Sequence, residues 1–452
     1  MRNGRLMFSA VLLLLPLLLL CGRAAGQGHP VAKVVNSPGS EPGIATTDPW
    51  SQIAKLSGQG AGAGNGASVA ISGNTIVVGA PVGYGSSGSG VAYVFVKPAS
   101  GWGNKIQTAQ LKSSDGQFCD LLGTSVAIVG NIIVVGAPQN YYICGGYAAG
   151  AVYVFVEPPG GWTGTVTETA KLTASDGAIN DALGYSISIS GNTVVAGAPG
   201  TIPSSKSGAA YVFVESASGW ANMTQTAKLT ESDGTADDAF GLSVSVSGST
   251  VVAGSPYASS GAGYVFVEPS GGWKNATQTA KLLASDGAAG DSLGYSVSVS
   301  GGTAAVGAPY AKIGSNAEQG AAYVFVEPAA GWSNATQTAK LTESDGLSGD
   351  YLGYSVAVNS TRVVAGASYY MRGPHTSGGG VAESYFHEGA VYVFSKPSGG
   401  WITTSSKIKL TGSDARFASY LGSSVAIGGS DVVAGAPGLE RGVGAAYLFV
   451  KP

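Results

Sequence analysis

The chain has 452 residues, 72 of them glycine, and it is 44 % hydrophobic but only 11 % charged. A disordered chain would be rich in charge and poor in apolar residues, and a collagen would carry glycine at every third position, so both classes are excluded. The formal net charge is −3 and no basic run occurs, which argues against a nucleic-acid partner.

The N-terminal segment has the pattern of a secretory signal peptide. Two arginines precede an apolar run at residues 11–20, and small residues follow it. This order predicts a signal peptide at 1–26, cleaved near Gly26, and a flexible leader at 27–49. We therefore expect a secreted, extracellular product without a membrane span.

Two alternatives remain for this segment. The apolar run could be a membrane anchor, although it is short for a spanning helix and contains Pro16. Cys21 could be a lipidated cysteine, although Leu20 stands where a small residue is expected.

Four short motifs recur seven times between residue 50 and the C-terminus. They are a tryptophan, Ala-Lys-Leu, Gly-Ala-Pro and Tyr-Val-Phe, each with variants. The leucine of the Ala-Lys-Leu motif falls at Leu56, Leu111, Leu172, Leu229, Leu282, Leu341 and Leu410. This self-similarity predicts an array of seven copies of one structural unit over residues 50–452.

Each copy contains four pieces with strand character. In one copy they lie at 295–300, 303–307, 321–326 and 337–342, separated by glycine and proline turn signals. The first two pieces are rich in small residues and the last two in large ones, which suits wedge-shaped sheets that converge on an axis. The prediction is an all-β, seven-bladed β-propeller with four antiparallel strands per blade and almost no helix.

The order of the strands also predicts how the ring closes. The array starts with a fourth strand at 52–56 and ends with a third strand at 445–450. The last blade is complete only if these two segments pair, so we expect the N-terminal strand to close it.

These motifs resemble the FG-GAP repeats of the integrin α-subunit head. The Phe-Gly pair of the FG-GAP motif occurs once in this chain, as Phe240-Gly241. In other repeats the pair is Leu-Gly, as at Leu183-Gly184. The resemblance implies a propeller that acts as a binding or adhesion module. Integrin repeats carry a calcium loop between the first and second strands, whereas this chain has a bare turn such as Ser190-Gly191-Asn192, so those calcium sites are not carried over.

Paired aspartates follow the fourth strand in five repeats. They are Asp115 and Asp120, Asp176 and Asp181, Asp233 and Asp238, Asp286 and Asp291, and Asp345 and Asp350. Two carboxylates could begin a calcium site. The favoured interpretation is structural, with Asp-Gly forming a turn and the second aspartate capping backbone N–H groups. No cofactor is therefore expected.

Two modifications are predicted for an extracellular protein. Cys119 and Cys144 lie in loops expected on one face of the second blade, so they could form a disulfide, the alternative being two separate thiols. Four N-glycosylation sequons begin at Asn222, Asn275, Asn334 and Asn359. The first three could also be copies of one duplicated turn sequence, and all four matter only in a eukaryotic source.

Catalysis has little support in the sequence. No metalloprotease or nucleophile-elbow motif occurs, and a glycosidase or lyase would need one unique pair of carboxylates rather than a repeated pair. We expect a non-catalytic, monomeric module that binds an extracellular protein or glycan. A structural matrix or wall component is the alternative, and a propeller glycosidase or lyase is less favoured.

The ligand is expected on the face that carries the fourth-to-first and second-to-third connections. The sequons are expected on the other face, and the longest variable loop, at 368–389, belongs to the first. Candidate ligand-binding residues in this loop and its counterpart in the second blade are Tyr369, Tyr370, Arg372, His375, Tyr385, His387, Tyr141 and Tyr142. The alternative is that the loop drifted in length and its aromatic residues pack on neighbouring blades. The spacing of His375 and His387 in the sequence does not support a metal site.

Overall fold

A computed structural model describes most of the compact unit that begins at Trp50. The described residues are 50–59, 64–81, 88–139, 149–200, 206–369, 371–372, 386–406, 408–414 and 418–451. The predicted signal peptide and leader lie outside them. No helix in these ranges is long and apolar enough to cross a membrane.

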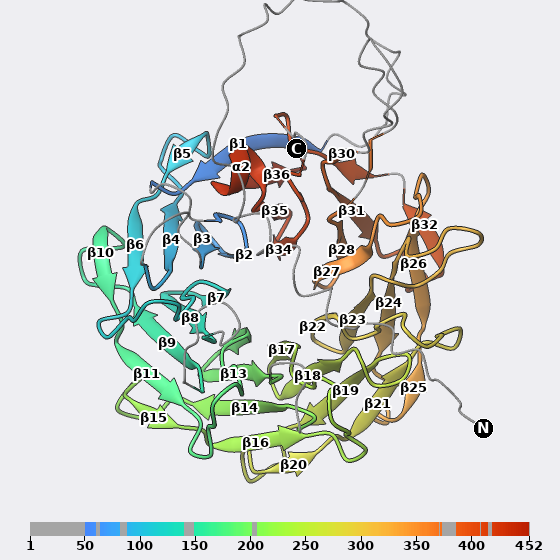
Figure 1. Cartoon of the computed structure of the whole chain (residues 1–452), viewed down its shortest axis with the longest axis horizontal. Coiled ribbons are helices and arrows are strands. Elements are labelled where there is room, and N and C mark those ends of the chain that lie inside the picture. Colours follow the sequence, from blue (N-terminus) through green and yellow to red (C-terminus); the bar gives the residue numbers. More distant parts are fainter. Residues whose placement is uncertain are drawn as a thin grey trace, which may run out of the picture. The chain divides into compact units, whose positions relative to one another are not determined.

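Seven β-sheets are arranged around a common centre, which confirms the predicted seven-bladed propeller (Figure 1). We number the blades 1 to 7 by their innermost strand. These strands are β2 (Ser68–Ser72), β7 (Ser125–Val129), β12 (Ser186–Ser190), β17 (Ser243–Ser247), β22 (Ser296–Ser300), β27 (Leu352–Val358) and β34 (Ser424–Gly428).

The second and third strands of each blade continue the antiparallel sheet outward. The second strands are β3 (Thr75–Ala80), β8 (Ile132–Ala137), β13 (Thr193–Ala198), β18 (Thr250–Ser255), β23 (Thr303–Ala308), β28 (Arg362–Ala367) and β35 (Asp431–Ala436). The third strands are β4 (Val91–Val96), β9 (Ala151–Val156), β14 (Ala209–Val214), β19 (Ala262–Val267), β24 (Ala321–Val326), β31 (Ala390–Ser395) and β36 (Ala445–Val450).

The fourth strands are shorter. They are β6 (Ala109–Lys112), β11 (Ala170–Thr173), β16 (Ala227–Thr230), β21 (Ala280–Leu283), β26 (Ala339–Glu343), β33 (Lys409–Leu410) and, in blade 7, β1 (Ser51–Ser57). Two further elements, the β29 (Met371–Arg372) and β30 (Phe386–His387) ribbon and helix α2 (Leu439–Gly442), lie outside the blades' sheets. α2 is the one helix in the described ranges, so the expected low helix content is confirmed for them.

A fifth, parallel strand extends six of the seven sheets, which the sequence did not predict. In each case the connection from third to fourth strand reaches back to the preceding blade and pairs there with its fourth strand, as β20 does with β16. These strands are β5 (Lys105–Ile106), β10 (Gly164–Thr167), β15 (Met223–Thr224), β20 (Ala276–Thr277), β25 (Ala335–Thr336) and β32 (Thr404–Ser406). Six of the seven blades therefore have one strand more than the four predicted.

The predicted closure of the ring is confirmed. β1 pairs antiparallel with β36, from Ser51 opposite Val450 to Leu56 opposite Ala446. Blade 7 therefore takes three strands from the C-terminal end of the chain and its fourth from the N-terminal end.

The hydrophobic core lies between neighbouring blades rather than inside one sheet. One cluster combines Val195 and Val212 of blade 3 with Val251 and Tyr264 of blade 4, all of them buried. Phe240, from the intact Phe-Gly motif, packs edge-to-face on Tyr264 with 5.6 Å between the ring centroids. A single four-stranded sheet could not bury both faces, so this stacking explains why the repeat exists as an array.

Close backbone approach explains the glycines of two motifs. A Cβ on Gly197 in the Gly-Ala-Pro motif would collide with the carbonyl oxygen of Gly241 in the next blade. The same carbonyl accepts a hydrogen bond from the hydroxyl of Ser186 (2.9 Å). The Gly-Ala-Pro and Leu-Gly or Phe-Gly motifs are thus two halves of one contact between blades.

Candidate functional site

The first aspartate of each pair joins two blades. Asp176, after β11, accepts hydrogen bonds from the hydroxyl of Tyr211 (2.9 Å) and from Nζ of Lys228 (2.5 Å), both in the next blade. The Lys228 hydrogen bond lowers the pKa of Asp176, desolvation by burial opposes this, and the Tyr211 hydrogen bond lowers it further. Nζ of Lys228 also lies 5.4 Å from the centroid of the Tyr211 ring.

The same aspartate–tyrosine–lysine arrangement recurs at five other junctions. Its members are Asp115 with Tyr153 and Lys171, Asp233 with Tyr264 and Lys281, Asp286 with Tyr323 and Lys340, Asp345 with Tyr392 and Lys409, and Asp414 with Tyr447 and Lys55. The last of these uses the N-terminal strand and reinforces the closure of the ring. These aspartates therefore have a structural role.

The junction between blades 7 and 1 differs from the other six. The Tyr93 hydroxyl donates to the carbonyl oxygen of Gln59 (3.2 Å), and Gln110 replaces the lysine of the Ala-Lys-Leu motif. The acidic and basic partners are thus absent together. The sequence shows that the aspartate and the lysine are missing from the same junction. This covariation is the signal from which the ion pair could have been predicted.

The second aspartate of each pair caps the turn that precedes it, as predicted. Its carboxylate accepts a hydrogen bond from the backbone N–H three residues earlier. The pairs are Asp120 with Gln117, Asp181 with Ala178, Asp238 with Thr235, Asp291 with Ala288, and Asp350 with Leu347, at 2.6–2.9 Å.

Calcium binding by these aspartates stays an unfavoured prediction. Across the described ranges, no group of three or more His, Cys, Asp or Glu side chains is placed to hold a metal ion. The ion pairs and caps account for the aspartates without one.

The asparagines of three sequons hold the fifth strands in place. Oδ1 of Asn222, Asn275 and Asn334 accepts a hydrogen bond from the backbone N–H of Lys171, Lys228 and Lys281, each at 2.8 Å. Asn104, which is outside any sequon, makes the same bond to Lys55. The strand pairing therefore accounts for asparagine at this position, and glycosylation is not needed to explain it.

Most of the predicted ligand-binding loop lies outside the described residues. This applies to Tyr370, His375, Tyr385, Tyr141 and Tyr142, and to Cys144. Backbone alone is described at Arg372 and His387, in β29 and β30. Cys119 is buried, and its predicted partner Cys144 lies outside the described residues, so the disulfide stays a prediction. Tyr369 is the one predicted ligand-binding residue whose side chain is described.

Tyr369 belongs to a contiguous group of aromatic rings. Its ring centroid lies 4.9 Å from that of Tyr351 and 5.1 Å from that of Tyr420. The contacts continue from Tyr351 to Tyr310 (5.3 Å), from Tyr310 to Tyr295 (6.0 Å), and from Tyr295 to Tyr354 (5.0 Å). We call these six residues the tyrosine cluster: Tyr295, Tyr310, Tyr351, Tyr354, Tyr369 and Tyr420.

The topology places the tyrosine cluster on the face predicted to bind. Tyr351 and Tyr420 come from fourth-to-first connections, Tyr310 and Tyr369 follow second strands, and Tyr295 and Tyr354 lie at the start of innermost strands. Because strand direction alternates, these positions share one side of the ring, near its centre (Figure 1). All six side chains are half-buried, so part of each remains accessible.

Comparison among the repeats shows that the scaffold does not need these tyrosines. The positions equivalent to Tyr351 hold Leu121, Ala182, Ala239 and Ser292 in other repeats. Those equivalent to Tyr369 hold Gln139 in blade 2 and Gly200 in blade 3, but a tyrosine again, Tyr257, in blade 4. The six rings in contact lie in blades 5 to 7, and related tyrosines, Tyr185 and Tyr257, occur in blades 3 and 4. The repeat itself accounts for Tyr295 and Tyr354, which share the Leu-Gly-Tyr sequence of Tyr185, but not for Tyr351 and Tyr420.

Two members of the tyrosine cluster hold an unfavourable backbone conformation. The φ angle is +59° at Tyr351 and +54° at Tyr420, a left-handed region that bulky residues rarely adopt. The loop requires this conformation in the other repeats too, where smaller residues such as Ala182 adopt it (φ +60°). Bulky residues held at such positions occur preferentially at functional sites.

The phenols of the tyrosine cluster stay neutral at physiological pH. Desolvation by burial, with a smaller contribution from Glu318, raises the pKa of Tyr351 to about 12. Burial likewise raises the pKa of the other five tyrosines above the usual value. The Tyr351 hydroxyl donates to Oε2 of Glu318 (3.2 Å).

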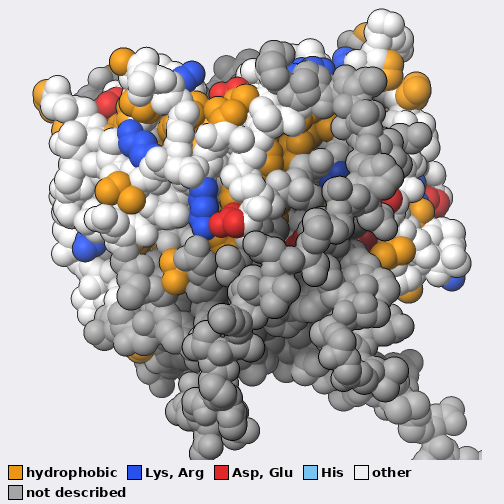
Figure 2. Space-filling model, turned by 90° about the horizontal axis from the view of Figure 1, so that it is seen from above, with side chains coloured by type: hydrophobic (Ala, Val, Ile, Leu, Met, Phe, Trp, Pro, Cys, Tyr) orange, Lys and Arg blue, Asp and Glu red, His pale blue; other side chains and the backbone are white. Residues whose placement is uncertain are grey.

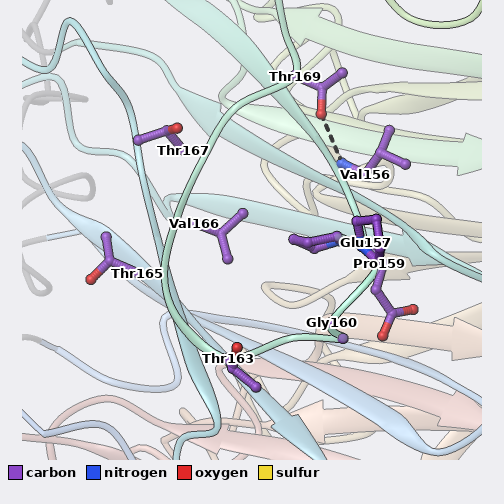
Figure 3. A pocket seen from close by; sticks show the side chains of 11 residues that line it. Val156, Glu157, Pro159, Gly160, Thr163, Thr165, Val166, Thr167 and Thr169 are labelled. Atoms are coloured by element: carbon purple, nitrogen blue, oxygen red, sulfur yellow. Dashed lines mark hydrogen bonds between the residues drawn. The ribbon is translucent and has the colours of Figure 1, made fainter.

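A separate hollow of about 560 Å³ lies on the outer side of the ring, under the connection that carries β10 (Figure 3). Its lining runs from Val156 to Thr169, with glycine, proline and threonine residues and the carboxylate of Glu157. The Val156 N–H donates to Oγ1 of Thr169 at 3.1 Å. This hollow brings together no acid–base pair and no aromatic ring, which makes it a weaker candidate than the tyrosine cluster.

On the side of the molecule that Figure 2 shows, the charged groups of the described residues do not form one dominant patch. On the side of the molecule in Figure 2, basic and acidic side chains are scattered singly or in opposite-charge pairs among uncharged ones. At six blade junctions a lysine–aspartate pair places opposite charges side by side.

Comparisons with known proteins agree with the architecture. The FG-GAP repeat family matches residues 50–95, 106–155, 166–213, 223–266, 276–325, 335–394 and 404–449. No curated protein matches the chain.

Two solved structures are similar in fold. The computationally designed Ika8 protein has 15 % sequence identity and a TM-score of 0.47, covering 88 % of this chain and 100 % of its own. The WD40 β-propeller domain of Doa1 has 12 % identity and a TM-score of 0.49, covering 89 % and 98 %. The seven family matches span the compact unit described above, and the chain belongs to the FG-GAP repeat family.

Proposed function

We propose that this protein is a secreted, non-catalytic binding module whose ligand docks on the tyrosine cluster. The observation that carries the proposal is the run of six half-buried tyrosine rings in blades 5 to 7, two of which, Tyr351 and Tyr420, stand where most other repeats have small residues. Tyrosine offers a large, rigid contact area and a hydroxyl at low entropic cost, and it is enriched where proteins bind partners.

The family and the sequence support the extracellular part of this proposal. FG-GAP propellers are typical of extracellular binding and adhesion proteins, and residues 1–26 have the pattern of a signal peptide. A disulfide between Cys119 and Cys144, N-glycans at Asn222, Asn275, Asn334 and Asn359, and a monomeric state belong to the same proposal. The ligand is an extracellular protein or glycan.

A capture experiment tests the proposal. The purified protein is immobilised and exposed to the extracellular fluid and cell-surface extract of the source organism. A double variant, Tyr351→Ala with Tyr369→Gln, carries residues that other repeats hold at the equivalent positions, so it should keep the fold. A second variant, Thr165→Ala with Thr167→Ala, alters the outer hollow and serves as the control.

The wild type and the control variant should retain the same molecules, and the double variant should lose them. Circular dichroism and thermal melting would establish that both variants are folded. Equal retention by all three proteins would contradict the location of the site, and retention of nothing by the wild type would contradict the function.

A further inference from the structure

The shape of the tyrosine cluster restricts the ligands that fit it. Neighbouring rings meet at 76–85° in three contacts and at 45–49° in two, so successive ring faces point in different directions. A small cation held by aromatic rings needs several faces turned toward one point. The tyrosine cluster takes its rings from three blades, 5 to 7, and so offers more aromatic surface than one small cation needs.

The chemistry of the tyrosine cluster is uncharged and rich in hydroxyl groups. A tyrosine phenol is protonated at neutral pH, so each can donate and accept a hydrogen bond. Each ring face carries the negative side of the aromatic quadrupole. The C–H bonds on the flat side of a sugar ring are weakly positive, and sugar hydroxyls pair with neutral donors and acceptors.

From this geometry we infer that the tyrosine cluster binds a neutral oligosaccharide, with sugar rings stacked on the tyrosine facets and their hydroxyls bonded to the phenols. This inference rests on the proposed function and narrows its ligand to one chemical class. A carboxylated or sulfated glycan would gain nothing from phenols, which carry no positive charge. Tyr351 and Tyr420 contribute because their strained backbone holds bulky rings where the loop would otherwise present small residues.

An array of neutral glycans, followed by calorimetry with the best hexasaccharide, tests the inference on the full-length protein. Choline and a proline decapeptide are measured in parallel as probes of a cation site and of an extended-peptide site. We expect a hexasaccharide to bind, its affinity to fall at least tenfold in Tyr369→Gln and in Tyr351→Ala, and to be unchanged in Thr165→Ala. Tyr310→Phe keeps the ring and should lose less than either.

Each other outcome overturns a defined part of the account. If choline or the proline peptide binds in a tyrosine-dependent way and no glycan does, the ligand class is wrong and the proposed function stands. The same holds if no glycan binds but the capture experiment retains a protein through the tyrosine cluster. Glycan binding that is equal in all folded variants would show that the tyrosine cluster is not the binding site. If the Tyr351→Ala variant fails to fold, the Tyr369→Gln variant alone still provides this test.

Discussion

Side chains at the blade junctions combine hydrogen bonds from tyrosine hydroxyls to carboxylates with ion pairs that remain partly exposed. The side chains of Asp176 and Lys228 are 48 % and 32 % exposed, so their attraction is screened by solvent and contributes little alone. The buried Tyr211 hydroxyl depends on the same carboxylate for an acceptor. The hydrogen bond to tyrosine therefore contributes more to stability than the ion pair does.

Replacement of Asp176 by asparagine should destabilise the protein by about 1 kcal/mol at pH 7. The pKa of Asp176 is lowered in the folded state, so its contribution is present above the ordinary carboxyl pKa and disappears as pH falls through the lowered value. Thermal melts from pH 7 to pH 2 should show the variant and the wild type converging in acid. Glu327→Gln, at a carboxylate outside these junctions, serves as a control, and a difference that stays constant down to pH 2 would contradict the assignment.

Two glutamates stand where other repeats have small residues. Glu343 is 4 % exposed, and the Tyr392 hydroxyl beside its carboxyl group donates to Oδ1 of Asp345 (2.8 Å). Burial, with smaller contributions from the nearby Asp350 and Asp345, raises the pKa of Glu343 to about 9. Burial likewise raises the pKa of Glu231 to about 7. Glu343 is thus accommodated in the fold as the neutral acid at pH 7, whereas Glu231 is about half ionised there.

Glu343→Gln should therefore make the protein more stable at pH 8 and reduce the dependence of its stability on pH. A raised folded-state pKa means that the wild type is most stable below the ordinary carboxyl pKa and loses stability as pH rises toward about 9. Thermal melts between pH 5 and pH 9 would measure this. Glu231→Gln should act in the same direction at lower pH, and an unchanged pH profile in both variants would show that the carboxyls are not buried.

At the scale of strands, the sequence predicted the elements that repeat and missed the one that crosses between blades. The strands predicted at 303–307 and 321–326 correspond to β23 and β24, because alternation and turn residues act within one copy. β20 has only two residues, too few for any pattern, and its partner belongs to another copy. The tyrosine cluster was missed for a similar reason, since its members are separated in sequence and meet only when the ring forms.

The fifth strands give a test that separates structure from glycosylation. Asn275→Ala removes the bond to the Lys228 N–H and should lower stability by roughly 0.5–1.5 kcal/mol, even without glycans. Thr277→Ala destroys the same sequon but keeps Asn275, so its stability should stay within about 0.5 kcal/mol of the wild type. Chemical denaturation of protein from a non-glycosylating host would compare them. Equal losses would mean that the asparagine bond does not hold the strand.

At the scale of the whole molecule, stability depends on joining the two ends of the propeller. β1 pairs along β36, and Lys55 reaches Asp414 at 2.7 Å, so one short segment completes both the sheet and the last ion pair. The neighbouring junction between blades 7 and 1 lacks an ion pair of this kind. We therefore expect the ring to open first around β1.

Deletion of residues 50–57 should lower the melting temperature by more than about 10 °C, because it exposes the edge of β36 and the core around Leu448. A synthetic peptide of residues 50–59, added in trans, should restore part of the loss. A truncated protein as stable as the full chain would contradict the closure.

The central claim is that a ligand docks on the tyrosine cluster, and hydroxyl-radical footprinting tests it most directly. The protein is oxidised with and without the molecules that it captures, and each peptide is quantified by mass spectrometry. We predict protection at Tyr310, Tyr351, Tyr369 and Tyr420, with no change at the outer hollow around Val166. Protection of the outer hollow or the fifth strands, with the four tyrosines unchanged, would contradict the account.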